Sequence, residues 1–383
     1  MRVEILPILQ EDEVAKAIRY DRAIILYGNS MCKSQIHQHQ SIYIRGHLRL
    51  LGRLVLALRN RNFQIDNLAA AYAPQFYRIV EAINDVAELD DKTNMYKHPT
   101  NASTLGTCLK KIGKILDVTY MIDKDLIKRK DVDDFMKIFD VDFFGTVNRV
   151  VTETHTKVKR QKKTILPRTG DIKSLSNYLK GKMEEYSEKL SKNFSYETWK
   201  SLAEVTLTAI QVFNRRRAGE TERILIEDYK NYVCACGTSS TCKTTKSDET
   251  HNYVRFTIRG KLCRTVPVLL DANMLKSIQL LLQYRKDANV PTHNPFLFGL
   301  PSKNKNKSKH LDACRLMRDF ASLCETENSS ALRGTALRKC GTILGSLCNV
   351  RQNTNNLSCC HFWNHVIVQQ LISFLHWHYF REH

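Results

Sequence analysis

Long apolar runs are missing from this 383-residue chain, and so are several motifs that would place it in a large protein class. No stretch approaches the roughly 20 consecutive apolar residues of a membrane-spanning helix, so we expect no membrane segment. The opening sequence, MRVEILPILQEDE, has neither a basic start nor an apolar core, and we expect no signal peptide. Neither a Walker loop nor a GxGxxG loop is present, and no internal repeat is visible.

Acidic residues are too few to balance the basic ones. The chain has 59 Lys and Arg against 39 Asp and Glu, a formal net charge of +20. A polyanionic partner is the first explanation, because basic side chains neutralise phosphates and release counterions. The alternative is a lysine-rich surface that only maintains solubility. Hydrophobic residues make up 43% and aromatic residues 9%, which suits a chain with a real core, and the length predicts two domains.

The cysteines do not suggest a disulfide framework. Twelve of them are scattered through a long chain, which argues for reduced thiols in the cytosol or nucleus. Cys234, Cys236, Cys242 and His251 invite a zinc interpretation. Their C-x-C-x5-C-x8-H spacing is not that of a standard zinc finger, and we expect no metal.

The first 155 residues or so have helical periodicity. In the segment 42–58 apolar residues recur at three- and four-residue spacings, and arginines fall largely on the other faces. The apolar set is Leu48, Leu51, Val55 and Leu58, and the basic set is Arg45, Arg49, Arg53 and Arg59. A second helix is predicted over 102–116, after a break at His98-Pro99, and a short acidic-aromatic helix or turn over 131–147.

A basic segment separates the two halves of the chain. Residues 157–168, KVKRQKKTILPR, contain six basic residues, no acid and the break at Pro167. We predict a linker here. Three interpretations remain open: a linker that follows a duplex, a nuclear import signal, or a solvated tether.

The second half combines helices with a β-hairpin. An apolar helix over 198–213 leads into three consecutive arginines, Arg215, Arg216 and Arg217. Residues 254–259 alternate between apolar and polar, and a Gly260-Lys261 turn and a second strand follow, which predicts a hairpin with Lys261 near its tip. Helices are predicted over 272–284, 310–323 and 330–347, and a short strand over 295–299.

The order of these motifs resembles the catalytic domain of tyrosine recombinases, the phage-integrase family, and in particular its divergent animal Crypton-type members. Residues 217–228, RAGETERILIED, fit the first arginine box of that family loosely. Residues 264–267, RTVP, fit the end of its hairpin, and Leu337-Arg338-Lys339 fits the second arginine. The resemblance covers about 170–350, and the helical first half corresponds to the core-binding domain by position only.

The resemblance implies a fold class and a division of the chain. The fold is mostly α with a small β-hairpin or three-stranded sheet. A helical N-terminal domain would occupy 1–155, a basic linker 156–170, an integrase-like α+β catalytic domain 171–350 and a divergent tail 351–383.

It also implies a chemistry. In this family a tyrosine attacks a backbone phosphate of double-stranded DNA without metal or ATP, so no cofactor is expected, and the enzymes act as multimers on DNA. Arg217 and Arg338 would bind the charged transition state and Lys261 would protonate the leaving 5′-oxygen. Glu220 would be a buried partner of an arginine and Asp228 a structural acid. A nuclear location follows from the same resemblance. Further contacts with the DNA backbone are expected from Arg215, Arg216, Lys157, Lys159, Arg160, Lys162, Lys163, Thr335 and Lys339.

Two departures from the family pattern leave the activity open. Thr335 occupies the position of a histidine or lysine, and a threonine hydroxyl is no general base at neutral pH. His365 can stand for the next conserved histidine, but nine residues later, where the nucleophile belongs, the chain has Phe374. The nearest tyrosine is Tyr379. The alternative is therefore a recombinase-derived nuclear protein that binds DNA without cleaving it.

Overall fold

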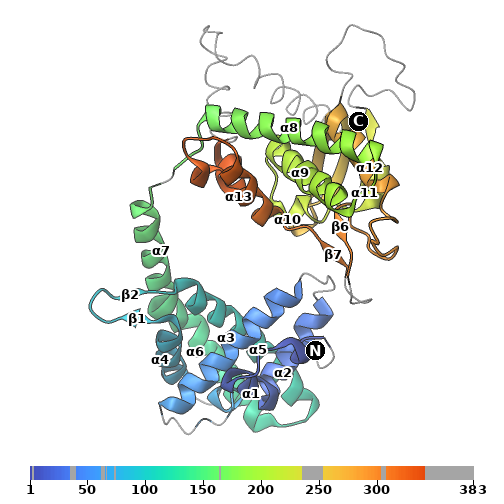
Figure 1. The fold of residues 1–383 in the computed structure, drawn as a ribbon. Helices are drawn as coiled ribbons and strands as arrows, with labels where there is room; N and C mark the ends of the chain where they lie inside the picture. The colour runs from blue at the N-terminus through green and yellow to red at the C-terminus, as the bar shows by residue number, and fades with distance from the viewer. Residues whose placement is uncertain are drawn as a thin grey trace, which may run out of the picture. The chain divides into compact units, whose positions relative to one another are not determined.

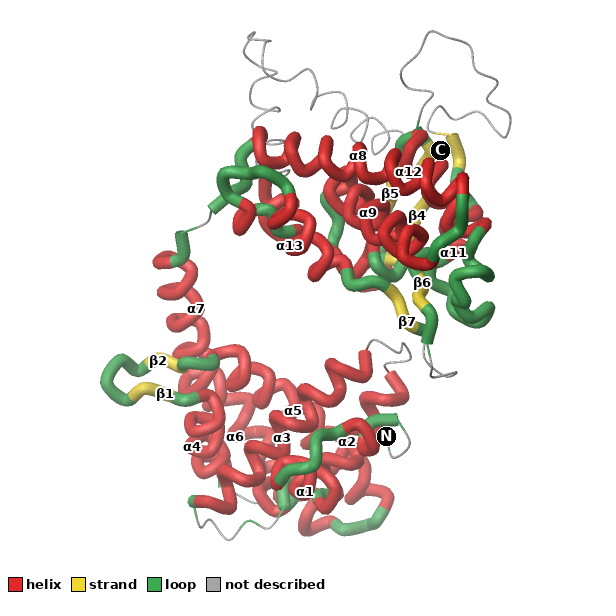
Figure 2. Tube along the Cα trace, viewed as in Figure 1, coloured by secondary structure: helices red, strands yellow, loops and turns green. Residues whose placement is uncertain are grey.

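The chain forms two compact units, Met1–Lys163 and Thr164–His383, which are considered separately (Figure 1). The computed structural model describes residues 1, 4–34, 40–61, 65, 67–72, 75–163, 165–234, 253–302 and 308–340. Most of these residues are helical, and the strands form small antiparallel sheets, which confirms the predicted fold class (Figure 2). Within this part of the chain, no helix has both the length and the apolar character needed to span a membrane.

The first unit is a bundle of helices with one two-stranded hairpin. Its elements are η1 (Leu6–Ile8), α1 (Glu13–Tyr20), α2 (Arg22–Ser34), α3 (Ser41–Asn60), η3 (Ala70–Tyr72), α4 (Phe76–Ala87), β1 (Leu89–Asp90), β2 (Met95–Tyr96), α5 (Pro99–Ile122), α6 (Leu126–Phe143), the π-helical η4 (Phe144–Asn148) and α7 (Arg149–Gln161). Proline at the first position of α5 confirms the predicted break, because proline lacks the N–H that a first helical turn cannot satisfy anyway.

The α3 helix is the centre of the first unit. Its apolar stripe, predicted from the spacing of Leu48, Leu51, Val55 and Leu58, is completely buried. The arginines of the other faces, such as Arg53, are more exposed. Burying one leucine side chain contributes about 1.5–3 kcal/mol, so this stripe accounts for the position of α3 against α1, α4 and α5.

The α5 and α6 helices approach each other closely at two glycines. A Cβ at Gly106 would lie 2.4 Å from the ring of Phe143, and one at Gly113 would lie 2.5 Å from Sδ of Met136. Only a residue without a side chain fits at these positions. One face of α6 is therefore packed closely against α5, and the opposite face of α6 points away from α5.

A polar triangle lies buried inside the first unit. The Tyr27 hydroxyl is 3.0 Å from Nδ1 of His47 and 3.4 Å from Sγ of Cys108, and the Cys108 and His47 atoms are 3.3 Å apart. Burial lowers the pKa of His47, and the nearby Lys111 ammonium adds to this effect.

The second unit is built around one buried helix. Its elements are α8 (Thr169–Lys192), α9 (Tyr196–Asn214), α10 (Ala218–Thr221), α11 (Ile226–Lys230), β3 (Val233–Cys234), β4 (Val254–Arg259), η6 (Lys261–Cys263), β5 (Thr265–Leu270), α12 (Ala272–Gln283), β6 (Gly299–Leu300), β7 (Lys309–His310), α13 (Ala313–Leu323), η7 (Ser329–Ala331) and a helical segment over 334–340. The α9 helix packs against α8, α12, α13 and β5. Its Trp199 donates its Nε1 hydrogen to the Leu281 carbonyl at 3.0 Å.

A three-stranded antiparallel sheet with the order β3-β4-β5 covers one side of α9. Val254, Phe256 and Ile258 of β4 are buried and the residues between them are more exposed, which confirms the predicted alternation. Arg259 pairs with Thr265 at the loop end of the hairpin. Pro267 lies in β5, which is an edge strand of this sheet, where the missing N–H is tolerated.

Several element boundaries differ from the sequence prediction. The predicted linker is helical up to Gln161, and residues from Thr169 onward already belong to α8. The strand predicted over 295–299 lies instead at Gly299–Leu300, where it pairs antiparallel with β7, Lys309–His310. The helix predicted from 310 therefore begins at Ala313, after the Asp312 cap.

Candidate functional site

The three arginines lie where the chain turns sharply between α9 and α10. Arg215 follows the last residue of α9 and adopts a left-handed conformation, with φ 50° and ψ 36°. Arg217 occupies the position just before the first residue of α10. The Arg217 side chain is 50% exposed, but Arg215 and Arg216 are half-buried. Burial lowers the pKa of both. The two arginines that the sequence suggested as contacts with the DNA backbone are thus more enclosed than Arg217.

Asn214 fixes this arginine turn to the hairpin. Its Oδ1 accepts a hydrogen bond from the Leu269 N–H at 2.8 Å, and its Nδ2 donates to the Leu269 carbonyl at 2.8 Å. Nδ2 also donates to the Ile210 carbonyl at 3.0 Å, within α9. Because β5 is an edge strand, the backbone N–H and carbonyl of Leu269 have no neighbouring strand on that side, and the buried Asn214 amide supplies the hydrogen bonds that such a strand would make.

Glu220 joins Arg217 to the loop of the hairpin. Its side chain is 8% exposed, and its Oε1 lies 2.9 Å from Nη1 of Arg217 in an ion pair. The same oxygen accepts a hydrogen bond from the backbone N–H of Lys261 at 3.4 Å. One buried carboxylate therefore contacts both predicted catalytic segments, and the expectation of a buried acid beside an arginine is met. The Lys261 side chain itself is exposed.

The hairpin loop is longer than the predicted two-residue turn. It spans 260–264, closes with a 2.7 Å hydrogen bond from the Gly260 N–H to the Arg264 carbonyl, and contains the 3-10 turn η6. Gly260 is required because a Cβ there would lie 2.4 Å from Cγ2 of Val266 and 3.4 Å from Oε1 of Glu220. The close packing of the loop backbone against Val266 thus depends on this glycine.

The helical segment 334–340, which carries Arg338, lies against the last turn of α9. A Cβ at Gly334 would be 2.6 Å from Nε2 of Gln211, and Cys340 is close enough to Arg215 to influence its pKa. Leu337 is buried and Arg338 half-buried. The structure therefore places the Arg338 segment and the arginine turn at the same end of α9. Thr335 and Lys339 are exposed on this segment.

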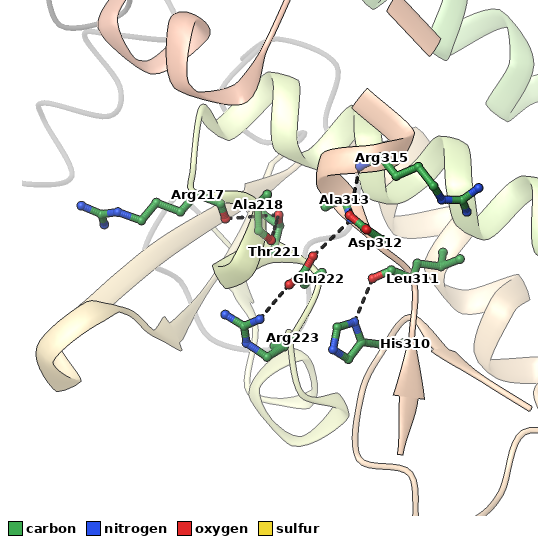
Figure 3. A network of polar contacts seen from close by, with 10 residues as sticks. All are labelled: Arg217, Ala218, Thr221, Glu222, Arg223, His310, Leu311, Asp312, Ala313 and Arg315. Carbon is green, nitrogen blue, oxygen red and sulfur yellow. Dashed lines mark hydrogen bonds and ion pairs between the residues drawn. The ribbon is translucent and has the colours of Figure 1, made fainter. Parts of the chain in front are cut away.

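A second acid, which the sequence did not single out, fixes α10 to α13 (Figure 3). Glu222 accepts a hydrogen bond from the Ala313 N–H at 3.2 Å, at the start of α13, and its other oxygen is 2.7 Å from Nη1 of Arg223. In Figure 3 the Arg217 side chain points away from this network. Glu222 lies 91 residues before its backbone partner, so no local spacing could have indicated the contact.

The remaining predicted residues fall into two groups. The linker residues Lys157, Lys159, Arg160, Lys162 and Lys163 are exposed at the end of the first unit. His365, Phe374 and Tyr379 lie outside the described residues, as do Cys236, Cys242 and His251. Among the residues that the structure describes, no group of three or more His, Cys, Asp and Glu is arranged to hold a metal ion.

No known family model and no curated protein matches this chain. Among solved structures, two complexes of the XerH site-specific recombinase are similar to it. The pre-cleavage complex with the difH substrate is 14% identical, with a TM-score of 0.31 and coverage of 80% of this chain and 86% of that one. The post-cleavage complex with a palindromic difH substrate is also 14% identical, with a TM-score of 0.32 and coverage of 84% and 91%. An identity of 14% and TM-scores of 0.31 and 0.32 do not assign the chain to a family, so its function has to be inferred from the site itself.

Proposed function

We propose that this protein binds duplex DNA and breaks and rejoins its strands through a phosphotyrosyl intermediate. The observation that supports this most directly is the buried Glu220 carboxylate, which contacts both Arg217 and the backbone of Lys261. These are the two residue types that the reaction requires: a permanently charged group for the phosphate oxygens and a proton donor for the leaving oxygen.

The arrangement suits a phosphate in transition-state geometry. An arginine fork can donate two parallel hydrogen bonds to nonbridging oxygens, and its charge persists at any physiological pH. Glu220 holds one end of the Arg217 guanidinium and so limits its rotation, while half of the side chain stays open to solvent. Holding such a donor in advance avoids reorganisation at the moment of reaction. Arg338 would supply the second fork from its segment at the end of α9.

The net charge of +20 supports the nucleic-acid partner, and the exposed basic residues at the end of α7 would contact the DNA backbone. Location in the nucleus and descent from a mobile element of the Crypton type belong to the same proposal. Tyr379 is the proposed nucleophile and His365 a proposed phosphate ligand, together with Arg217, Lys261 and Arg338.

A second candidate is a recombinase-derived nuclear protein that binds DNA and no longer cleaves it. Two substitutions favour it. Thr335 lacks the basic group of the family pattern, and Phe374 occupies the expected position of the nucleophile. Neither change would affect the arginines, so DNA binding would survive.

A nicked duplex that traps the covalent intermediate separates the two candidates. If the chain is active, a protein–DNA adduct appears on a denaturing gel and is abolished by Tyr379→Phe. Arg217→Ala should reduce the adduct about 10²–10³-fold, the loss typical of one transition-state donor. Arg318→Ala, which removes an exposed arginine of α13, is the matched control and should leave it unchanged.

The role of Lys261 has its own test. Lys261→Ala should slow cleavage of ordinary DNA, whereas a substrate with sulfur in place of the leaving 5′-oxygen should be cleaved at nearly the normal rate. A thiolate leaves without a proton donor because its pKa is far below that of an alcohol. Lys276→Ala on α12 is the control. Absence of any adduct, with salt-sensitive duplex binding retained, would support the binding-only candidate. Absence of duplex binding at low salt would contradict both.

A further inference from the structure

The outward face of α6 carries a charge pattern that is complementary to itself. Four residues of this helix, Val132, Phe135, Phe139 and Phe143, face the core of the first unit. On the exposed side of α6, and continuing into the first residue of η4, six exposed positions follow one another at alternating spacings of four and three residues. They are Leu126, Lys130, Asp133, Lys137, Asp140 and Phe144. Alternating three- and four-residue spacing is the seam by which two helices pack side by side. We call these six residues the α6 stripe.

The α6 stripe is symmetric about residue 135: the charged residues at equal distances on either side have opposite signs, and the residues at both ends are apolar. Leu126 and Phe144 lie nine positions on either side of it, Lys130 and Asp140 five positions, and Asp133 and Lys137 two positions. In an antiparallel pair of identical helices, each position meets its mirror position on the other copy. Every lysine of the stripe would then face an aspartate, and the apolar ends would face each other.

The apolar ends are unusually exposed. Leu126 is 72% and Phe144 68% exposed, and beside them Ile127 is 79% and Val141 78% exposed. These large side chains lie at the start of α6 and at its junction with η4, so an antiparallel partner would cover both groups at once. Single exposed apolar residues are normal, but two such groups that flank a charge palindrome require a common explanation.

The charged residues of the stripe have only weak partners within the chain. Lys137 lies 2.6 Å from Asp133 and 3.3 Å from Asp134, and Lys110 lies 2.6 Å from Asp140. All of these groups are about half or more exposed, and ion pairs of this kind contribute little. Sharing them with a second copy would therefore cost little.

We propose that two copies of this protein associate through the α6 stripe, antiparallel and related by a two-fold axis near residue 135. A self-complementary patch is what such a symmetric interface requires. A polyanion is a poorer occupant, because Asp133, Asp134 and Asp140 would repel it. The α6 helix is about 27 Å long, so one helix pair buries less than a standard interface of about 800 Å² per partner. The dimer is accordingly weak, with a dissociation constant on the order of micromolar.

Two complementary variants test the charge pattern without removing the helix. The acidic variant combines Lys130→Glu with Lys137→Glu, and the basic variant combines Asp133→Lys with Asp140→Lys. Each places like charges opposite each other in its own dimer. In an equimolar mixture, one copy of each kind restores four pairs of opposite charge.

The full chain without DNA is examined by sedimentation velocity over a range of concentrations. We expect each variant alone to raise the dissociation constant about tenfold or more, and the mixture to return it to within about threefold of the unmodified protein. Failure of the mixture to restore association would overturn the palindromic pairing. An unmodified chain that stays monomeric up to about 100 µM would overturn the dimer, because this association is expected near micromolar concentrations. Far-UV circular dichroism confirms that both variants remain helical.

A third variant tests the apolar ends. Leu126→Ser combined with Phe144→Ser should weaken association at least as strongly as either charge variant. The matched control is Leu323→Ser on α13, which removes an apolar side chain that is 62% exposed in the other unit. Equal weakening by the control would show that association depends on exposed apolar surface in general, and would overturn the assignment to α6. None of these residues belongs to the proposed DNA site, so strand cleavage and dimerisation can fail independently.

Discussion

Replacing Asn214 with aspartate tests whether one buried amide holds the arginine turn against the hairpin. Asn214→Asp keeps an acceptor for the Leu269 N–H and removes both donations from Nδ2, to the carbonyls of Leu269 and Ile210. At neutral pH it also brings a carboxylate against those two carbonyl oxygens, at a position only 5% exposed. Each buried group left without a hydrogen bond costs about 1–3 kcal/mol. We therefore expect the free energy of unfolding of the second unit to fall by about 3 kcal/mol.

Tryptophan fluorescence isolates this effect during urea unfolding, because the first unit contains no tryptophan and Trp199 is buried in α9 of the second. Asn231→Asp is a closely matched control. Asn231 also donates from Nδ2 to the carbonyl four residues earlier, at 3.1 Å, but its side chain is exposed. There the same substitution should change the free energy of unfolding by less than about 0.5 kcal/mol.

The penalty at position 214 should depend on pH in one direction. Burial and the neighbouring carbonyls raise the pKa of the introduced carboxyl in the folded state above its unfolded value of about 3.9. The folded variant then binds more protons, so its stability falls as pH rises through the folded pKa. The difference from the unmodified protein should be largest near pH 7 and should shrink towards pH 4. A difference below about 0.5 kcal/mol at pH 7, or one that does not change with pH, would refute this account of Asn214.

Three further predictions concern other residues of the two units. Because the pKa of His47 is lowered in the folded state, the unfolded first unit binds a proton more readily. The free energy of unfolding should therefore fall as pH drops below about 6.5, by at most about 1.4 kcal/mol per pH unit. His47→Gln should reduce this pH dependence, measured by urea unfolding followed by circular dichroism. Gly106→Ala should lower the free energy of unfolding of the first unit by about 1–3 kcal/mol, because the added Cβ meets the Phe143 ring. In the same assay Gly181→Ala within α8, where an added Cβ has no atom within 4 Å, should raise the free energy of unfolding of the second unit by about 0.5–1 kcal/mol. Glu220→Gln should reduce adduct formation about 10²-fold and change duplex affinity little, because it removes the charge that holds the Arg217 guanidinium in place and leaves the arginine charge intact; an unchanged cleavage rate would contradict the positioning role.

Periodic features of this fold could be predicted from the sequence because their cause is local. The buried stripe of α3 and the alternation of β4 each follow from a repeat that the folded backbone imposes. The pairing of Arg217 with Glu220 belongs to the same class, because residues three apart lie on one side of a helical turn. The three-residue spacing in the arginine box therefore identified Glu220 as the buried carboxylate that pairs with Arg217.

Contacts between distant segments could not be predicted in this way. Asn214 meets Leu269 55 residues later, and Glu222 meets Ala313 91 residues later, and neither pair leaves a periodic signal. The position of β6 and the first residue of α13 were missed for the same reason, since Gly299 becomes a strand only because His310 pairs with it. The candidate site thus depends on residues whose importance emerges only when the segments meet.

The enclosure of Arg216 leads to a last prediction about stability and function. Its Nε is buried without a hydrogen-bond partner among the described residues, and burial lowers the pKa of its guanidinium. A buried charge without full compensation destabilises a fold, and an apolar side chain of similar size in its place is often neutral or stabilising. Arg216→Met should therefore maintain or raise the free energy of unfolding of the second unit without DNA.

The same substitution should weaken binding of a short duplex, because an incoming phosphate would offset the cost of the buried charge. In thermal unfolding, the duplex should raise the midpoint of the unmodified protein more than that of Arg216→Met. Arg217→Met provides the comparison: its side chain is half exposed, so it should lose duplex stabilisation with little gain in the free protein. If Arg216→Met instead lowers stability by more than about 1 kcal/mol in the absence of DNA, the arginine is a structural element of the turn. A gain in stability together with a loss of duplex stabilisation in Arg216→Met would support a role of Arg216 in binding phosphate.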